Sequence, residues 1–99
     1  MSADVVKSVV IGAGVVGCAV SRELAHMGLE PLILEAGPRI AEGTTSRNSG
    51  VIHAGIYYPP QSLKADLCIE GKSLLYEWVQ KRDVGFQKCG KWIVAADDE

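Results

Sequence analysis

Two apolar runs and the segment between them carry the clearest hydrophobic pattern of the chain. Residues 5–11 are rich in β-branched side chains without strict alternation, which is typical of a buried parallel strand, and residues 32–34 form a second such run. Residues 15–27 between them predict a helix that Gly28 ends as its C-terminal cap. A right-handed crossover would make the two strands parallel. The helix stripe expected to face the strands comprises Val16, Ala19, Val20, Leu24 and Met27.

The pattern changes after the second run. Residues 36–50 are rich in Gly, Ser, Thr and Asn and show no period, and a structureless stretch this long inside a compact domain is usually functional. Residues 51–58 then predict a strand, and Ser62 predicts the N-cap of a long helix through about Arg82. The helix face expected to be apolar comprises Leu67, Gly71, Leu74, Leu75 and Trp78.

The last part of the chain predicts two short strands, at residues 86–88 and 91–96. The fold class is therefore α/β: a Rossmann-type strand–helix–strand unit, followed by a long loop, a strand, a long helix and short strands. Two parallel strands and one crossover helix do not complete a doubly wound sheet, because both of its faces need cover and further strands. We therefore expect residues 1–99 to be the N-terminal part of a dinucleotide-binding domain, without a substrate domain.

Composition narrows the class of protein. The 99 residues are 47% hydrophobic and 22% charged, which is typical of one small globular domain. A net charge of −2 gives no reason to expect nucleic acid as a partner. No apolar run predicts a transmembrane segment or a signal peptide, so we expect a cytoplasmic protein, with peripheral association at the inner membrane left open. Three scattered cysteines and two histidines show no metal-ligand spacing and predict no metal site.

A glycine motif between the first strand and the helix carries the strongest functional signal. Gly12 permits a tight turn, Gly14 lets the backbone approach a pyrophosphate, and Gly17 lets the helix pack close to the strands. The helix N-terminus offers free N–H donors and a partial positive charge to phosphates. Glu35 follows about 20 residues later, where a dinucleotide-binding fold needs an acid for the ribose hydroxyls. These residues predict an adenine dinucleotide site.

A second motif covers residues 44–58. Its first half can bind a diphosphate or a flavin edge through hydroxyls, an amide, backbone N–H groups and one guanidinium. In its second half, strand parity would place His53, Gly55 and Tyr57 on one face, where Gly55 would leave a slot for a flat ring or a small substrate. The alternative is that His53 and Tyr57 hydrogen-bond within a core and that Gly55 is a bulge.

Several segments together resemble the D-amino-acid-oxidase-like superfamily of FAD-dependent oxidoreductases, and within it the L-2-hydroxyglutarate dehydrogenases, also described as oxidases. The superfamily adds a substrate domain to its FAD-binding half, and full members are several times longer than this chain. The resemblance therefore implies an enzyme that oxidises a 2-hydroxy acid with FAD. Its electron acceptor, which could be oxygen, a quinone or another carrier, is left open. The segments that carry it are residues 10–17, 35–37, 46–58, 62–65, 89–91 and 93–95.

The resemblance also implies roles for individual residues. The three glycines, with the backbone of Val15 and Val16, would hold the FAD pyrophosphate, and Glu35 would take the ribose hydroxyls with Ala36 beside it. Arg39 would lie near the adenosine half, and His53 near the flavin ring, where a covalent bond to FAD is left open. His53 and Tyr57 are the candidate catalytic residues. The residues expected along the pyrophosphate are Thr45, Ser46, Arg47, Asn48, Ser49 and Gly50.

Other readings stay open at this point. A nicotinamide-binding domain is compatible with Glu35, although the long polar loop and residues 46–58 argue against it. Other flavoenzymes of the superfamily, which oxidise amino acids or glycerol 3-phosphate, remain alternatives to the 2-hydroxy acid. A truncated FAD-binding remnant without catalysis is the third possibility.

Overall fold

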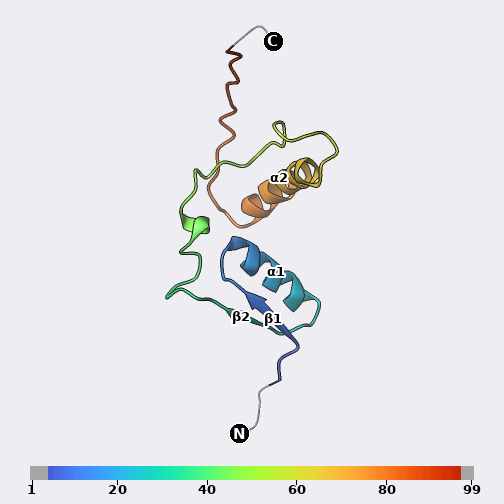
Figure 1. The fold of residues 1–99 in the computed structure, drawn as a ribbon, viewed down its shortest axis with the longest axis vertical. Coiled ribbons are helices and arrows are strands. Elements are labelled where there is room, and N and C mark those ends of the chain that lie inside the picture. The colour runs from blue at the N-terminus through green and yellow to red at the C-terminus, as the bar shows by residue number, and fades with distance from the viewer. Residues whose placement is uncertain (1–4, 97–99) are drawn as a thin grey trace. The chain divides into compact units, whose positions relative to one another are not determined.

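The computed structural model describes residues 5–96, which fall into two compact units divided between Val51 and Ile52. The first unit contains β1 (Ser8–Ile11), α1 (Val15–His26), β2 (Pro31–Leu34) and a single 3₁₀ turn, η1 (Thr44–Ser46). The strands are parallel, Ser8 opposite Pro31 and Ile11 opposite Leu34, and α1 packs against both of them (Figure 1). The predicted strand–helix–strand unit is therefore confirmed, with a first strand that begins later than residue 5.

The face that α1 turns to the strands differs from the predicted apolar stripe. Val16 and Met27 are exposed by 73% and 74%, whereas Ser21 is buried. Gly17, one turn before Ser21, would clash with backbone if it carried a side chain. The helix lies so close to the turn and the strands that small residues are needed on this face, and they displace the larger apolar ones. Of the predicted stripe only Leu24 is half-buried, and the prediction was wrong at the other four positions for that reason.

The end of α1 follows the prediction. Gly28 has a positive φ of 77°, its N–H donates to the carbonyl of Ala25, and the Leu29 N–H donates to the carbonyl of Leu24. These two bonds form a Schellman motif, in which the residue after the helix is left-handed and is usually glycine. Gly28 therefore ends the helix and turns the chain toward β2.

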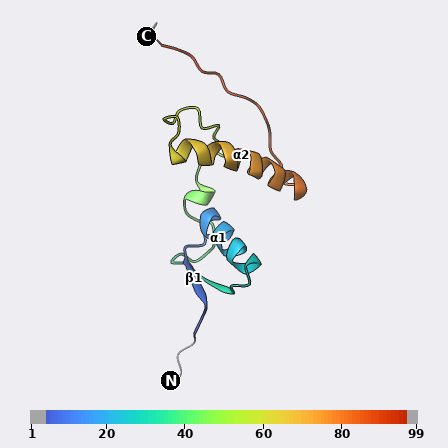
Figure 2. The same cartoon turned by 90° about the vertical axis from the view of Figure 1, so that its right-hand side faces the viewer.

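The second unit contains one helix, α2 (Leu63–Lys81), preceded by a loop that folds back beside it (Figure 2). Ser62 is its N-cap, and the Ser62 hydroxyl accepts a hydrogen bond from the Ala65 N–H at 3.2 Å, as predicted. The helix ends with the same pair of bonds as α1, but the left-handed residue is Asp83, with φ of 53°. A non-glycine residue in this conformation is uncommon, although aspartate tolerates it better than most.

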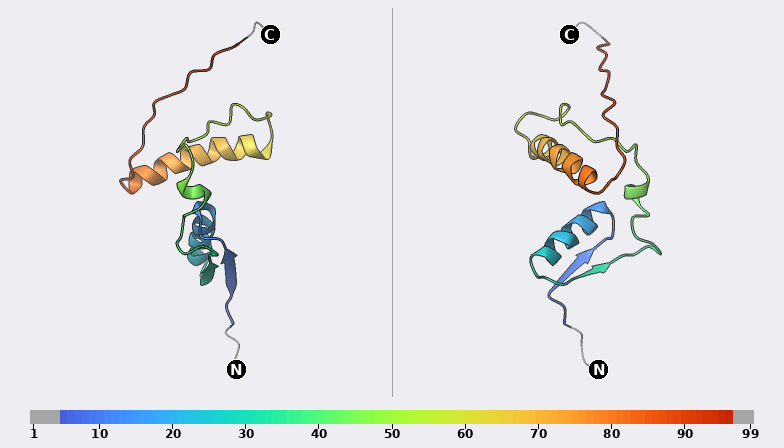
Figure 3. Two further views of the ribbon diagram at one scale, coloured as in Figure 1. Left: turned by 60° about the vertical axis from the view of Figure 1, so that its left-hand side comes forward. Right: turned by 180° about the vertical axis from the view of Figure 1, so that it is seen from behind.

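The three strands predicted in the second unit are absent from residues 52–96. Residues 51–54 have no regular structure, and residues 55–58 form a turn flanked by bends. In this turn Gly55 has a φ of 84° and the Tyr58 N–H donates to the Gly55 carbonyl. Residues 85–96 are extended but not paired (Figure 3). A strand is held by hydrogen bonds to a neighbouring strand, and the only ladder among residues 5–96 joins β1 to β2. Apolar, β-branched sequence without a partner strand therefore stays irregular.

Little of the apolar surface is buried in either unit. Ala13 in the first unit and Ala65 and Val79 in the second are the buried hydrophobic residues of the described part. On α2, Leu67 and Trp78 from the predicted apolar face are exposed by 57% and 40%. No helix within residues 5–96 is both long enough and apolar enough to cross a bilayer.

Candidate functional site

The glycine-rich turn joins β1 to α1 and is fixed by backbone contacts. Gly12 has a φ of 102°, which a residue with a side chain rarely adopts, and its N–H donates to the Leu34 carbonyl at 2.7 Å. A Cβ on Gly17 would lie 1.9 Å from the Gly12 carbonyl oxygen. The first glycine therefore makes the turn, and the third lets the helix approach the turn, as the sequence predicted.

The N-terminus of α1 presents backbone donors beside this turn. Gly14 is the N-cap and supplies no side-chain cap; instead the Thr45 hydroxyl accepts from the Val15 N–H at 2.9 Å. The next two N–H groups, of Val16 and Gly17, have no acceptor among residues 5–96. Unpaired N–H groups at a helix N-terminus attract anions such as phosphate. The arrangement leaves at least two donors for a ligand.

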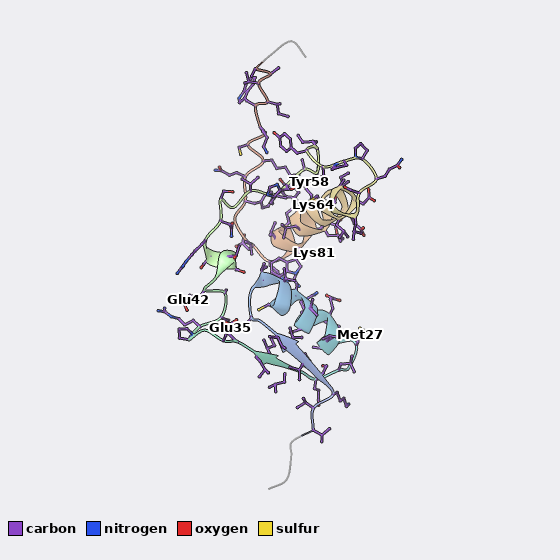
Figure 4. All side chains as sticks on the ribbon, in the orientation of Figure 1. Met27, Glu35, Glu42, Tyr58, Lys64 and Lys81 are labelled. Carbon is purple, nitrogen blue, oxygen red and sulfur yellow. The ribbon has the colours of Figure 1, made fainter. Side chains whose placement is uncertain are left out.

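Glu35 follows β2 and lies beside the glycine turn (Figure 4). One carboxylate oxygen accepts from the Ala13 N–H and the other from the Gly37 N–H, each at 2.8 Å. These bonds, with the Gly37 N–H contributing most and a smaller bond from Ala36, hold the pKa of Glu35 below its usual value. Each oxygen keeps a second lone pair for a ribose hydroxyl. The hydrogen bond from the Ala13 N–H thus holds the predicted ribose-binding carboxylate beside the glycine turn.

The polar loop is attached to the turn and braced internally. The Ala41 N–H donates to the Ala13 carbonyl at 2.9 Å, which holds the loop against the glycine motif. The Asn48 amide donates to the carbonyls of Thr44 and Thr45, and its oxygen accepts from the Gly50 N–H. The Asn48 side chain therefore shapes the loop around Thr45.

The other loop residues predicted to bind the cofactor differ in whether their side chains already make hydrogen bonds or ion pairs within the loop. The Ser46 hydroxyl donates to the loop carbonyls of Glu42 and Gly43. Arg39 lies 3.9 Å from the Glu42 carboxylate, whereas the side chains of Arg47 and Ser49 make no hydrogen bond or ion pair within residues 5–96. Arg47 is thus the loop cation that is available for an anionic ligand, and Ser46 supports the loop.

The candidate catalytic residues lie in the second unit and lack the predicted geometry. Since residues 51–58 are not a strand, strand parity does not align His53 with Tyr57. The predicted slot at Gly55 is wrong as well: a Cβ there would lie 3.1 Å from the Ala65 carbonyl oxygen and 3.2 Å from the Ile69 side chain. Gly55 therefore allows close packing on α2. His53 and Tyr57 are both exposed.

Lysines over tyrosine rings are the feature of the second unit that sequence reasoning missed. The Lys91 ammonium lies 5.0 Å from the centroid of the Tyr57 ring. The Lys64 ammonium lies 4.2 Å from the centroid of the Tyr58 ring, and Figure 4 labels these two residues. Exposed pairs of this kind contribute about 0.5–1 kcal/mol. Lys64 sits six residues after Tyr58, across the start of α2, and only the folded loop brings the two together.

Comparison with known proteins assigns the family. The sequence profile described as FAD dependent oxidoreductase matches residues 7–99. The chain belongs to the FAD-dependent oxidoreductase family. Its relatives include the mitochondrial L-2-hydroxyglutarate dehydrogenases of Arabidopsis thaliana, 56% identical over 91% of this chain, and of Homo sapiens, 47% identical over 92%. The enzyme of the same name from Caenorhabditis elegans is 47% identical over 92%. The chain spans about a fifth of the length of these relatives, between 19% and 22%.

The geometry of the first unit fits the cofactor of the family, FAD. Gly14 offers no side chain to obstruct a pyrophosphate, the N–H groups of Val16 and Gly17 are available to it, and Arg47 carries an uncommitted positive charge. Hydrogen bonds from Gly37 and Ala13 lower the pKa of Glu35 beside the turn. The expected cofactor is therefore confirmed at the level of the family, while the contact made by each individual residue stays a prediction.

Proposed function

We propose that the complete gene product carrying residues 1–99 is an FAD-dependent oxidoreductase that converts L-2-hydroxyglutarate to 2-oxoglutarate. The observation that supports this most strongly is 47–56% identity to enzymes with that name, across more than nine-tenths of this chain. The intact glycine turn with Glu35 anchored beside it supports the FAD site. The substrate and the reaction come from the relatives' names.

In this proposal the first unit binds the adenosine and pyrophosphate parts of FAD. The N–H groups of Val16 and Gly17 donate to phosphate oxygens, and Glu35 accepts from the ribose hydroxyls with Ala36 beside it. Arg47 adds charge complementarity to the pyrophosphate, and Arg39 lies toward the adenosine. Bound FAD supplies the acceptor for the hydride that leaves C2 of the hydroxy acid. The chain's own contribution is to bind and orient the cofactor, since positioning is what the protein adds to such chemistry.

His53 is proposed as the base that accepts the proton of the substrate hydroxyl. An imidazole suits this role because its unprotonated ring nitrogen can accept a proton. The exposed position of His53 leaves it accessible to a ligand. Tyr57, which lies beneath the Lys91 ammonium, is proposed to line the same substrate region.

The test of His53 is its replacement in the complete gene product. We expect His53→Ala to lose most of the turnover, by about 100-fold or more in kcat, the range of general base catalysis. His26→Ala is the matched control, because His26 lies at the end of α1 away from the glycine turn and should leave kcat unchanged. A near-normal kcat in His53→Ala would remove His53 from the mechanism.

The reaction itself is tested by anaerobic flavin spectroscopy. The purified protein should be yellow, and L-2-hydroxyglutarate should bleach its flavin absorbance while the D-enantiomer does not. Bleaching by an amino acid or by glycerol 3-phosphate instead would favour one of the alternative flavoenzymes. A protein that binds FAD but is reduced by none of these would support a non-catalytic remnant.

The electron acceptor and the location belong to the same proposal. Oxygen and a quinone are distinguished by following reoxidation of the substrate-reduced protein with each acceptor. The relatives named above are called mitochondrial, and a cytoplasmic location for this chain is a separate proposal made from its sequence. Fractionation of cells that express the tagged protein would decide between cytosol, membrane surface and organelle.

A further inference from the structure

The segment that follows α2 is held in the second unit by contacts with aromatic rings. The Phe86 ring packs edge-on against the Tyr76 ring of α2, with the two centroids 5.3 Å apart, and the Lys88 ammonium lies 4.4 Å from the centroid of the same tyrosine. Further along the segment, the Lys91 ammonium lies 5.0 Å from the centroid of the Tyr57 ring. The segment therefore carries Lys91 to the loop that precedes α2.

The positive charge of Lys91 is available to a ligand. No ion pair within residues 5–96 includes Lys91, and the residue is exposed. An ammonium group has three N–H donors, and the face of a tyrosine ring occupies only one side of it. Tyr57 is itself exposed by 61%, so a ligand can reach the ring and the cation together.

The substrate of the proposed function has a carboxylate at each end. The C1 carboxylate adjoins the reacting carbon, C2, and is shared by every 2-hydroxy acid. The C5 carboxylate distinguishes this substrate from monoacids of similar shape, and a cation is the partner that compensates its desolvation. His53 is the residue proposed to act at C2. Because Lys91 reaches the same loop from a separate segment, it suits the end of the substrate that lies away from C2.

We propose that Lys91 is a specificity-determining residue that binds the C5 carboxylate of the substrate, while the Tyr57 ring holds its ammonium in place. The inference rests on the proposed function, which supplies the substrate and places His53 and Tyr57 beside it. A lysine ammonium is a compact point charge with rotatable donors, so it accommodates a carboxylate from several directions. The charge favours a 2-hydroxy diacid over a monoacid.

The test is Lys91→Gln in the complete gene product, assayed with L-2-hydroxyglutarate and with L-2-hydroxybutyrate, which lacks the C5 carboxylate. Loss of a hydrogen bond between charged groups should raise KM for the diacid about tenfold or more, with kcat changed far less. Anaerobic flavin reduction at low concentrations of the monoacid measures its kcat/KM even where turnover is slow. That value should stay within about twofold of the wild type.

Lys88→Gln is the matched control. Lys88 belongs to the same segment and lies over a tyrosine ring in the same way, but that ring belongs to α2. Its replacement should leave both substrates unaffected. Lys91→Arg keeps the charge and should raise KM for the diacid by no more than about threefold. Flavin content and thermal unfolding should be alike in Lys91→Gln and Lys88→Gln, because each loses one exposed contact between a cation and a ring.

Ionic strength gives a second measurement that a purely structural role would not change. KM for the diacid should rise with salt in the wild type and much less in Lys91→Gln, because salt screens the attraction between the ammonium and the carboxylate. If L-2-hydroxyglutarate reduces the wild-type flavin but KM in Lys91→Gln is unchanged, the inference is overturned and the proposed function stands. An equal loss with the monoacid has the same meaning. No reduction of the wild-type flavin by L-2-hydroxyglutarate would overturn both.

Discussion

The two α-helices within residues 5–96 begin in opposite ways. Helix α2 is capped by Ser62, whose hydroxyl accepts the N–H of Ala65 three residues later. Helix α1 has glycine at the same position and takes its cap from Thr45 in the following loop. The cap of α2 is therefore supplied by the residue that directly precedes the helix. The start of α1 depends on a loop, a turn and a strand end that must all be in place.

The number of free N–H groups does not distinguish the two helix starts. At α2 the Ser62 hydroxyl satisfies the Ala65 N–H, and the N–H groups of Leu63 and Lys64 have no acceptor among residues 5–96. At α1 the N–H groups of Val16 and Gly17 have no acceptor among residues 5–96 either, and glycine at the N-cap keeps the backbone accessible. We expect the start of α1, which is built from long-range contacts, to respond to substitutions that the locally capped α2 tolerates.

The largest effect is expected at Gly17. Gly17→Ala would place a Cβ 1.9 Å from the Gly12 carbonyl oxygen, which is backbone and has little room to move. We expect a loss of about 3 kcal/mol in the free energy of unfolding, at the upper end of overpacking costs, and loss of bound FAD. Urea unfolding and the flavin content of the purified variant measure both.

Gly43→Ala is the control for Gly17→Ala. Gly43 lies in the loop of the same unit, has a negative φ, and would meet no atom within 4 Å if it carried a Cβ. Its replacement should change neither stability nor flavin content appreciably. Equal effects of the two substitutions would contradict the close approach of α1 to the turn.

The second prediction concerns pH and Glu35. Because hydrogen bonds from Gly37 and Ala13 lower the pKa of the folded state, this carboxylate contributes stability fully above 4.5, its usual value. That contribution is lost as the pH falls through the lowered pKa. The glutamine of Glu35→Gln has only one acceptor oxygen, so it cannot accept from both N–H groups. We expect this variant to bind FAD more weakly at neutral pH and to lose the acid-dependent part of the stability.

Thermal unfolding between pH 3 and pH 7 measures the Glu35 effect. The wild-type and Glu35→Gln curves should differ most at neutral pH and converge under acid conditions. A constant difference across the whole range would mean that ionised Glu35 does not stabilise the turn.

A smaller effect is expected at the start of α2. Ser62→Ala removes the local cap and should cost about 1 kcal/mol of unfolding free energy without changing the Kd for FAD. Ser73→Ala, in the exposed middle of the same helix, should cost nothing, because alanine is the better helix former. A change in FAD affinity with Ser62→Ala would break the distinction between the two helix starts.

The smallest effect on stability is expected at Gly71, which like Gly17 is a glycine inside a helix. A Cβ on Gly71 in α2 would meet no atom within 4 Å. Gly71→Ala should therefore stabilise the protein by about 1 kcal/mol, the difference in helix propensity. A destabilised Gly71→Ala protein would mean that another segment packs closely on this face of α2.

The sequence was sufficient wherever the relevant contacts are close along the chain. The strand–helix–strand unit, the Ser62 cap and the Gly28 terminus were all predicted, because each follows from residue type and short spacing. The glycines and Glu35 were predicted with their positions in the turn. The cap by Thr45 was not, because nothing in local spacing links residues 15 and 45.

Predictions failed where a segment depends on partners. Residues 51–58 have the composition of a strand, but no strand among residues 5–96 pairs with them, and the left-handed Gly55 folds the segment onto α2. The parity argument for His53 and Tyr57 failed with the strand. The predicted faces of α1 and α2 failed for a related reason, since periodicity locates apolar side chains but not the surface that covers them.

The most direct test of the account is a titration of the apoprotein with FAD and, separately, with NAD. A glycine turn with anchored Glu35 and a capped α1 predicts one FAD bound per chain, with strong quenching of flavin fluorescence, and much weaker binding of NAD. Tighter binding of NAD than of FAD, or binding of neither, would contradict the assignment of this site to FAD.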